Sequence, residues 1–254
     1  MNIRATFLAI VLLLPLLAPR QALCADVAVR SVMVATPEQP VEARLFSAPG
    51  ADKRPAVILL HGRGGLDRFQ GYYEQFAQAI ARAGMDAYLL SYYLGADKEQ
   101  ANAEEKTVRQ AFFARRLKAW SLLVRAVVDA ALARPQCSGS VGLLGFSQGG
   151  FLATAAASQD ARVAALVVFY GGVPDTLRDS ITHLPPLLAL HGDADGVVPL
   201  EQGQALVALG RQLGQPAELV VLPGAGHGFK GPDAENAQQQ TLAFLRQRLL
   251  SSQP

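Results

Sequence analysis

The sequence of 254 residues has little of what metal and cofactor sites require. Its two cysteines, Cys24 and Cys137, do not form a paired-cysteine motif, and there is no H-E-x-x-H sequence or cluster of carboxylates. The nucleotide-binding patterns G-x-x-x-x-G-K-S/T and G-x-G-x-x-G with a following acid are also absent. We therefore expect neither a bound metal nor a cofactor.

An excess of charge of either sign is missing as well. The 23 Lys and Arg residues are nearly balanced by 21 Asp and Glu residues, which gives a formal net charge of +2. Proteins that bind nucleic acid or anionic membranes through charge carry a clear basic excess. The sequence therefore argues against both kinds of partner.

Long apolar runs are scarce, and the one near the start, Phe7–Leu17, has eleven residues. A membrane-spanning helix needs about 20 apolar residues, so a spanning anchor is the weaker interpretation. Arg4 before the run and Ala22-Leu-Cys24 after it are typical of a signal peptide. We expect residues 1–24 to be cleaved and residues 25–254 to be periplasmic or secreted. Lipid attachment at Cys24 is the alternative.

The rest of the chain predicts one α/β domain. Eight apolar segments have the length and composition of strands, and helical patterns separate most of them. Nearly continuous apolar strands are typical of a doubly wound, mostly parallel sheet with helices on both faces. We expect strands at residues 27–35, 41–47, 56–60, 86–91, 140–146, 163–169, 186–191 and 217–222, and helices at 72–83, 114–133, 148–158, 201–213 and 233–250.

A nucleophile motif lies between the fifth predicted strand and the helix that follows it. Gly145-Phe-Ser147-Gln-Gly149 has the form G-x-S-x-G, in which a tight turn exposes the serine hydroxyl at the end of a strand. Small residues are needed around such a turn because larger side chains would collide with the adjoining strand and helix. Gly145, Gly149 and Gly150 meet that need.

An acid and a histidine follow in the order that a catalytic triad of this kind requires. Asp195 follows the seventh predicted strand, and His227 follows the eighth. Catalytic groups of open α/β sheets collect at the carboxyl ends of the strands. We therefore expect Ser147 as nucleophile, His227 as base and Asp195 as the carboxylate that orients the base. Asp193 follows the same strand and competes for the acid position; the preference for Asp195 comes from the family resemblance given below, and we expect Asp193 to bind the backbone of its own turn.

These motifs resemble those of the α/β-hydrolase superfamily and, within it, the dienelactone hydrolase family. The carrying segments are Pro55–Gly62, Gly145–Gly150, His191–Pro199 and Gly226–Phe229. The resemblance extends from about Val41 to the C-terminus and implies an α/β-hydrolase fold. Two positions differ from the best-known members: Ser147 replaces a cysteine nucleophile, and Gly62 replaces an acidic residue.

The fold implied by this resemblance also predicts two backbone donors for the oxyanion of the reaction. One is the amide of the residue after the nucleophile, Gln148, and the other comes from the loop after an early strand. In the segment His61–Gly65 we expect the amide of Arg63 to be the second donor, with Gly64 as the alternative. A flexible turn is the plainer interpretation of this glycine-rich segment.

The segment from residue 94 to 113 breaks the alternation of strands and helices. It forms either a small lid or an extension of the next helix, and its early charges favour an exposed helix. Its aromatic residues Phe112 and Phe113, like Trp120 further on, are more typical of core than of an acyl pocket. Tyr92 and Tyr93, just past a strand end, are better candidates for the pocket.

The other histidines have structural interpretations. His61 and His191 each precede a glycine at a strand end, and His183 lies in a loop without an evident partner. The remaining cysteine, Cys137, is expected to be an inert thiol.

Together these features predict a serine hydrolase that cleaves a small-molecule ester, thioester or lactone without a cofactor. A carboxylate-bearing substrate is a further hypothesis, because Arg63, Arg68, Arg115 and Arg116 include candidate site cations. A serine peptidase is one alternative, although peptidases of this fold usually carry an extra domain or a larger cap. A non-catalytic binding protein is the other, although such proteins normally lack a member of the triad.

Overall fold

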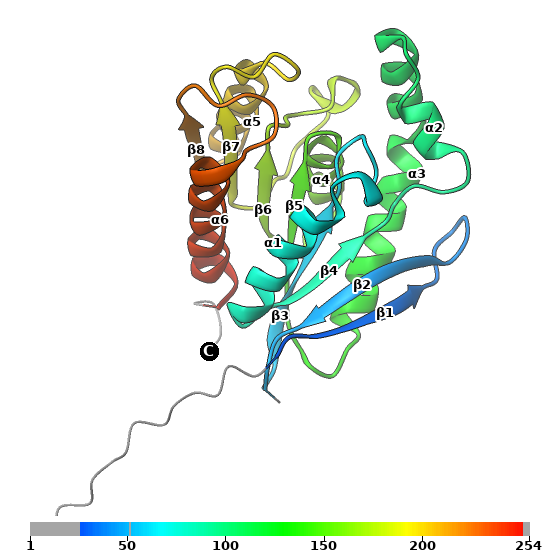
Figure 1. Ribbon diagram of the computed structural model, residues 1–254, viewed down its shortest axis with the longest axis vertical. Helices are drawn as coiled ribbons and strands as arrows, with labels where there is room; N and C mark the ends of the chain where they lie inside the picture. Colours follow the sequence, from blue (N-terminus) through cyan, green and yellow to red (C-terminus); the bar gives the residue numbers. More distant parts are fainter. Residues whose placement is uncertain (1–25, 51, 251–254) are drawn as a thin grey trace, which may run out of the picture.

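The computed structural model describes residues 26–50 and 52–250 (Figure 1). These residues form one eight-stranded sheet in the spatial order β1-β2-β4-β3-β5-β6-β7-β8. The pairs β1–β2 and β2–β4 are antiparallel, and the remaining pairs are parallel. The strands match all eight predicted segments and comprise Ala28–Val34 (β1), Val41–Ser47 (β2), Arg54–Leu60 (β3), Asp86–Leu90 (β4), Cys137–Phe146 (β5), Val163–Phe169 (β6), Leu187–Gly192 (β7) and Ala217–Leu222 (β8).

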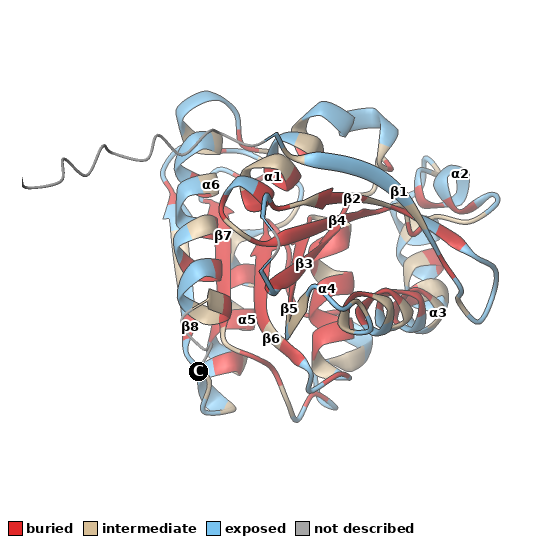
Figure 2. Cartoon of the chain, turned by 90° about the horizontal axis from the view of Figure 1, so that it is seen from below, coloured by how far each residue is buried: buried red, intermediate tan, exposed pale blue. Residues whose placement is uncertain are grey.

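Helices cover both faces of the sheet (Figure 2). Helices α1 (Gln70–Arg82) and α6 (Gly231–Leu245) pack on one face, and their apolar side chains share one core cluster with that face. Helices α3 (Lys106–Leu132), α4 (Gln148–Ser158) and α5 (Leu200–Gln212) form the second cluster on the other face. This two-faced burial explains why the central strands are apolar throughout rather than alternating.

The burial of individual strands follows their place in the sheet. Every residue of β3, β4 and β7 is buried, whereas most residues of the edge strand β1 are exposed. Burial of apolar surface at about 25 cal/mol per Å² is the main stabilising contribution to such a core. The loops at the carboxyl ends of the parallel strands are thereby supported on a rigid platform.

In the segment from residue 94 to 113 the structure shows the predicted extension of the next helix, preceded by a short separate helix. A short helix, α2 (Asp97–Ala101), precedes α3, which begins at Lys106 rather than at the predicted Ala114. The early charges of α3 lie on an exposed face, so the helix extends by two turns without burying them. Phe112 and Trp120 are buried in the core, as expected for aromatics at this spacing.

Three single-turn elements complete the described structure: η1 (Asp67–Phe69), η2 (Asp175–Leu177) and the π-helical turn η3 (Arg246–Leu250). None of the helices in the described part of the chain has the length and apolar composition to cross a bilayer. The predicted signal peptide, residues 1–24, lies outside the described residues.

Candidate active site

Ser147 forms a one-residue turn between β5 and α4. Its backbone has φ 54° and ψ −119°, a conformation that residues with a side chain seldom adopt. Holding such a residue there costs about 1–3 kcal/mol, which the surrounding structure must offset. The Ser147 amide donates a hydrogen bond of 2.9 Å to the carbonyl oxygen of Phe169 on β6. The turn is therefore fixed to the neighbouring strand.

The glycines around Ser147 are required by packing, as the sequence predicts. A Cβ atom at Gly145 would lie 2.1 Å from the carbonyl oxygen of Gly149. A Cβ atom at Gly149 would lie 2.3 Å from the carbonyl oxygen of Leu60 on β3. Helix α4 therefore approaches the ends of β5 and β3 more closely than any side chain would allow.

The structure brings the three predicted triad residues together. Ser147 Oγ lies 2.9 Å from His227 Nε2, and His227 Nδ1 lies 2.8 Å from Asp195 Oδ2. The Asp195 side chain is fully buried, whereas the His227 side chain is partly exposed. The three groups form a continuous hydrogen-bonded chain from a buried carboxylate to a hydroxyl at the end of the sheet.

Asp195 is held by its own loop. Its Oδ1 accepts hydrogen bonds from the amides of Val197 and Val198, at 2.8 and 2.9 Å. These two donors fix one carboxylate oxygen and leave Oδ2 facing the imidazole of His227. The carboxylate is therefore oriented before any substrate binds.

The competing acid, Asp193, has a different contact. Its Oδ1 accepts a hydrogen bond of 2.6 Å from the amide of Gly224, in the loop that leads to His227. The expectation that Asp193 binds its own turn is therefore wrong. The loop after β8 passes close to the loop after β7, and Asp193 ties the two together.

His191 is structural, as expected from its place before a glycine. Its Nε2 lies 2.8 Å from the carbonyl oxygen of Val198 and 3.6 Å from Asp195 Oδ2. Because a carbonyl oxygen can only accept, Nε2 carries a proton and donates it. His191 thus supports the same turn that holds Asp195.

The segment His61–Gly65 follows β3 and lies beside Ser147. The carbonyl oxygen of Gly62 contacts His61 Nδ1 at 2.9 Å and the amide of Gly65 at 3.1 Å. A planar trans peptide directs its N–H away from its carbonyl, so these contacts also set the direction of the Arg63 amide. Within the described residues, the amides of Arg63 and Gly64 have no hydrogen-bond acceptor.

The amide of Gln148 belongs to the first turn of α4, where backbone N–H groups have no partner inside the helix. The partial positive charge of a helix N-terminus further favours an anion there. The predicted donors, Gln148 and Arg63 or Gly64, thus lie on two segments that adjoin Ser147. Both segments carry N–H groups available to a ligand.

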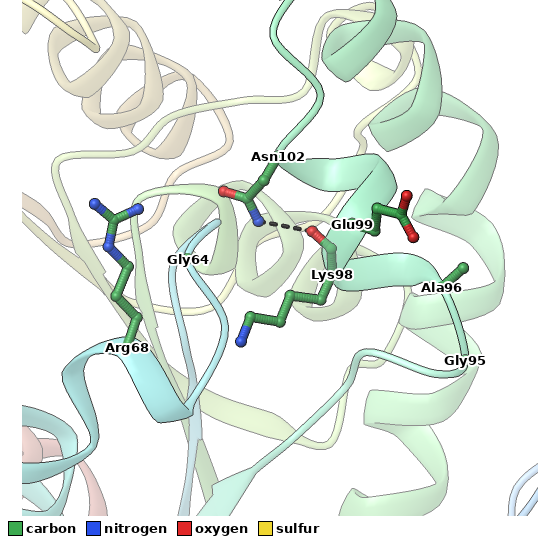
Figure 3. A pocket seen from close by; sticks show the side chains of 7 residues that line it. All are labelled: Gly64, Arg68, Gly95, Ala96, Lys98, Glu99 and Asn102. Carbon is green, nitrogen blue, oxygen red and sulfur yellow. Dashed lines mark hydrogen bonds between the residues drawn. The ribbon is translucent and has the colours of Figure 1, made fainter.

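A cavity of about 690 Å³ opens beside this loop. Figure 3 shows Arg68 on one side of the cavity and, on the other, Lys98 of α2 and Asn102, the residue after that helix, with Gly64 between them. Lys98 forms an ion pair with Asp67. The arginine Arg63 is half-buried, and its pKa is lowered by burial and by the nearby Arg109 and Arg68.

The other predicted cations lie elsewhere. Arg116 forms a two-pronged contact with Glu38, at 2.8 and 2.7 Å, and also contacts Asp97. Arg115 contacts Gln100 at 2.9 Å. Neither lines the cavity next to Gly64.

Several site residues were missed by the sequence reasoning. Tyr170, at the end of β6, packs edge-on against the His227 ring with centroids 4.8 Å apart. It adopts a positive φ of 37°, and its place just past a strand end is the only sequence signal that it carried. Asn102 donates to the carbonyl oxygen of Arg63, and nothing in the local sequence distinguishes it. The Gln148 side chain donates to the Tyr93 hydroxyl, whereas the sequence indicated only a role for its backbone amide.

The order and direction of the strands, with helices on both faces, define an α/β-hydrolase fold. Two solved structures share it: a putative dienelactone hydrolase from Klebsiella pneumoniae (TM-score 0.74, 19% identity, 87% of this chain and 99% of that chain) and a dienelactone hydrolase from Anabaena variabilis (TM-score 0.72, 22% identity, 88% and 99%). At these identities the likeness concerns the fold alone.

The sequence itself gives the family. The profile of the dienelactone hydrolase family matches residues 41–250, so the chain belongs to that family. A probable carboxylesterase SOBER1-like protein from Arabidopsis thaliana is 31% identical over 137 residues. That alignment covers 51% of this chain and only half the length of the relative. No group of three or more metal-binding side chains is present in the part of the chain that the structure describes.

Proposed function

We propose that this protein is a serine-dependent hydrolase of carboxylic esters, thioesters or lactones. The observation that carries the proposal is the hydrogen-bonded chain from Ser147 Oγ through His227 to Asp195, with distances of 2.9 and 2.8 Å. A serine hydroxyl becomes an effective nucleophile when an oriented base accepts its proton during attack. Membership of the dienelactone hydrolase family and the carboxylesterase relatives support the same class of substrate.

The reaction proceeds in two stages. Ser147 Oγ attacks the carbonyl carbon of the substrate while its proton passes to His227 Nε2. The product of this step is a tetrahedral species in which the former carbonyl oxygen is an oxyanion. The amides of Gln148 and Arg63 donate to that oxyanion, and each such donor is worth about 3–4 kcal/mol. The bond to the leaving alcohol or thiol then breaks, and His227 returns the proton to the leaving group. A lactone keeps its leaving alcohol on the acyl chain.

Water completes the cycle. A water molecule attacks the acyl carbon and gives a proton to His227. As the second tetrahedral species collapses, the bond to Ser147 Oγ breaks, His227 returns the proton to that oxygen, and the acid is released. Throughout, Asp195 stabilises the imidazolium form of His227 and holds its ring in place. The cavity next to Gly64 would hold part of the substrate. Export through cleavage after Cys24 belongs to the same proposal.

A fluorophosphonate probe tests this mechanism directly. We expect labelling of the wild-type protein at Ser147, hydrolysis of nitrophenyl esters, and loss of both in Ser147→Ala. Folded protein that neither reacts with the probe nor hydrolyses any ester or lactone of graded size would favour the binding-protein alternative. Hydrolysis of aminoacyl-naphthylamides without hydrolysis of esters would favour the peptidase alternative.

A further inference from the structure

The segment His61–Gly65 is called the oxyanion loop below. Two side chains from outside this loop contact the same backbone carbonyl within it. The Tyr93 hydroxyl donates a hydrogen bond of 2.9 Å to the carbonyl oxygen of Arg63, and Asn102 Nδ2 donates one of 3.0 Å to the same oxygen. The peptide group that contains this carbonyl also contains the amide of Gly64, the alternative second donor, and it follows directly on the amide of Arg63. Because the group is planar and trans, two donors on the oxygen fix the direction of the N–H as well.

Tyr93 also reaches the second oxyanion segment. Its hydroxyl oxygen accepts a hydrogen bond of 2.8 Å from Gln148 Nε2. Gln148 is the residue after the nucleophile, and its amide is the other donor in the proposed mechanism. One hydroxyl therefore joins the loop after β3 to the start of α4, the two segments that must hold the oxyanion together.

The ring of Tyr93 is held in place by aromatic neighbours. It packs edge-on against His61 and Tyr92, with centroids 4.7 and 4.9 Å apart, and against Trp120 at 5.4 Å. Burial raises the pKa of Tyr93, so its hydroxyl remains protonated and able to donate near neutral pH. The contact is therefore built into the resting enzyme rather than formed on binding.

Asn102 is fixed from the other side. Its Nδ2 carries two protons, and the second is donated to the carbonyl oxygen of Lys98 at 2.7 Å (Figure 3). Asn102 directly follows α2, and the start of that helix is tied to the core, because Asp97 accepts hydrogen bonds from Trp120 Nε1 at 2.9 Å and from the amide of Leu94 at 3.0 Å. The helix α2 thus supports the oxyanion loop as well as lining the cavity.

We propose that Tyr93, with Asn102, is a positioning residue that holds the two oxyanion segments at the separation needed in the transition state. This inference rests on the proposed hydrolase function and extends it to residues that do not touch the reacting atoms. Oxyanion donors act through pre-organisation, so loosening their support lowers kcat while leaving ground-state binding nearly unchanged.

The test compares Tyr93→Phe with Tyr88→Phe. Tyr88 lies on β4, the strand that precedes Tyr93; it is buried, and its hydroxyl accepts a hydrogen bond of 3.1 Å from Arg134 and does not contact the oxyanion loop. With a nitrophenyl ester we expect Tyr93→Phe to lose about tenfold in kcat with KM within about twofold of wild type, and the rate of fluorophosphonate labelling to fall in parallel. Tyr88→Phe should keep wild-type kinetics.

Asn102→Ala provides a second arm, because Asn102 is exposed and its substitution leaves the core intact. We expect a loss of about threefold in kcat with unchanged KM. If the wild-type protein is active and Tyr93→Phe has the same kcat, the positioning role is refuted while the hydrolase function stands. Where Tyr93→Phe does not fold, an unchanged kcat in Asn102→Ala refutes it in the same way. A wild-type protein that neither hydrolyses esters nor reacts at Ser147 would refute both.

Discussion

The ring of Tyr92 stacks on the imidazole of His61, with centroids 4.0 Å apart, while its hydroxyl donates a hydrogen bond of 2.8 Å to the His61 carbonyl oxygen. The His61 side chain is fully buried. Burial lowers the pKa of His61 from 6.5 to about 4, so the ring is neutral in the folded protein at neutral pH. Because the carbonyl oxygen of Gly62 can only accept, Nδ1 carries the proton of the neutral ring and donates it to that oxygen.

This pKa shift predicts a loss of stability in acid. The pKa of His61 in the folded protein lies below its value in the unfolded chain. The stability that depends on a neutral His61 is therefore fully present above about pH 6.5 and is lost as the pH falls toward 4. The loss amounts to about 3 kcal/mol between pH 7 and pH 4. His61→Asn keeps a donor near the Nδ1 position without a titrating ring. Between pH 7 and pH 4 the free energy of unfolding of this variant, measured in urea, should fall by about 3 kcal/mol less than that of the wild-type protein. If both proteins lose stability equally with falling pH, His61 is not the group responsible.

Asp195→Asn should abolish most activity without unfolding the protein. The amides of Val197 and Val198 will hold the amide oxygen of the asparagine, which turns its NH₂ group toward His227 Nδ1. His227 must then carry its proton on Nε2 and no longer accepts the Ser147 proton. We expect kcat to fall by about 10³–10⁴-fold, as in other triads that lose the correct tautomer.

Asp193→Asn is the matched control for this variant. An amide oxygen there still accepts from Gly224, so activity should stay close to wild type. Equal losses in kcat for the two variants would show that the acid has been assigned wrongly. Circular dichroism spectra of both proteins would establish that each is folded.

Gly145→Ala tests the close approach of α4. The added Cβ would lie 2.1 Å from the backbone oxygen of Gly149, which no rotamer change relieves. We expect a loss of more than about 4 kcal/mol in unfolding free energy, or failure to fold. In Gly71→Ala on α1 the added Cβ meets nothing within 4 Å, and this variant should be more stable than wild type by about 0.5 kcal/mol. Thermal melting of the two variants, prepared side by side, gives the comparison.

Arg68 tests whether the cavity prefers anionic substrates. It lines the cavity beside Gly64, and its guanidinium has no acidic partner among the described residues. Arg68→Gln should raise KM for a carboxylate-bearing ester by about fivefold, less at high salt, and leave KM for a neutral ester unchanged. Arg115→Gln, outside the cavity, should change neither. Equal effects on both esters would argue against an anion site.

The fold and the triad were predictable because each depends on local sequence. Continuous apolar runs gave the eight strands, and the glycines around Ser147 reflect contacts that exclude any Cβ atom. The extension of α3 back to Lys106 was one of two forms that the sequence left open, and the charges from Lys106 to Arg109 favoured it because they suit an exposed helix.

The support of the oxyanion loop was beyond prediction for a different reason. It depends on β4 lying next to β3, which brings Tyr93 to the carbonyl oxygen of Arg63 across 30 residues of sequence. Asn102 reaches the same oxygen from a separate polar segment. Neither contact follows from spacing or residue type. The sequence therefore indicated only that Tyr92 and Tyr93 are candidates for the pocket, and it gave no role to their hydroxyl groups.

At position 147 the backbone conformation, with φ at 54°, and the proposed chemistry favour different residues. Glycine would adopt that conformation with less strain than serine, yet it has no hydroxyl with which to form an acyl intermediate. The backbone at position 147 therefore favours glycine, whereas the proposed chemistry requires serine. A search for stabilising substitutions in this chain would select glycine at position 147, and the more stable protein would lack the proposed nucleophile.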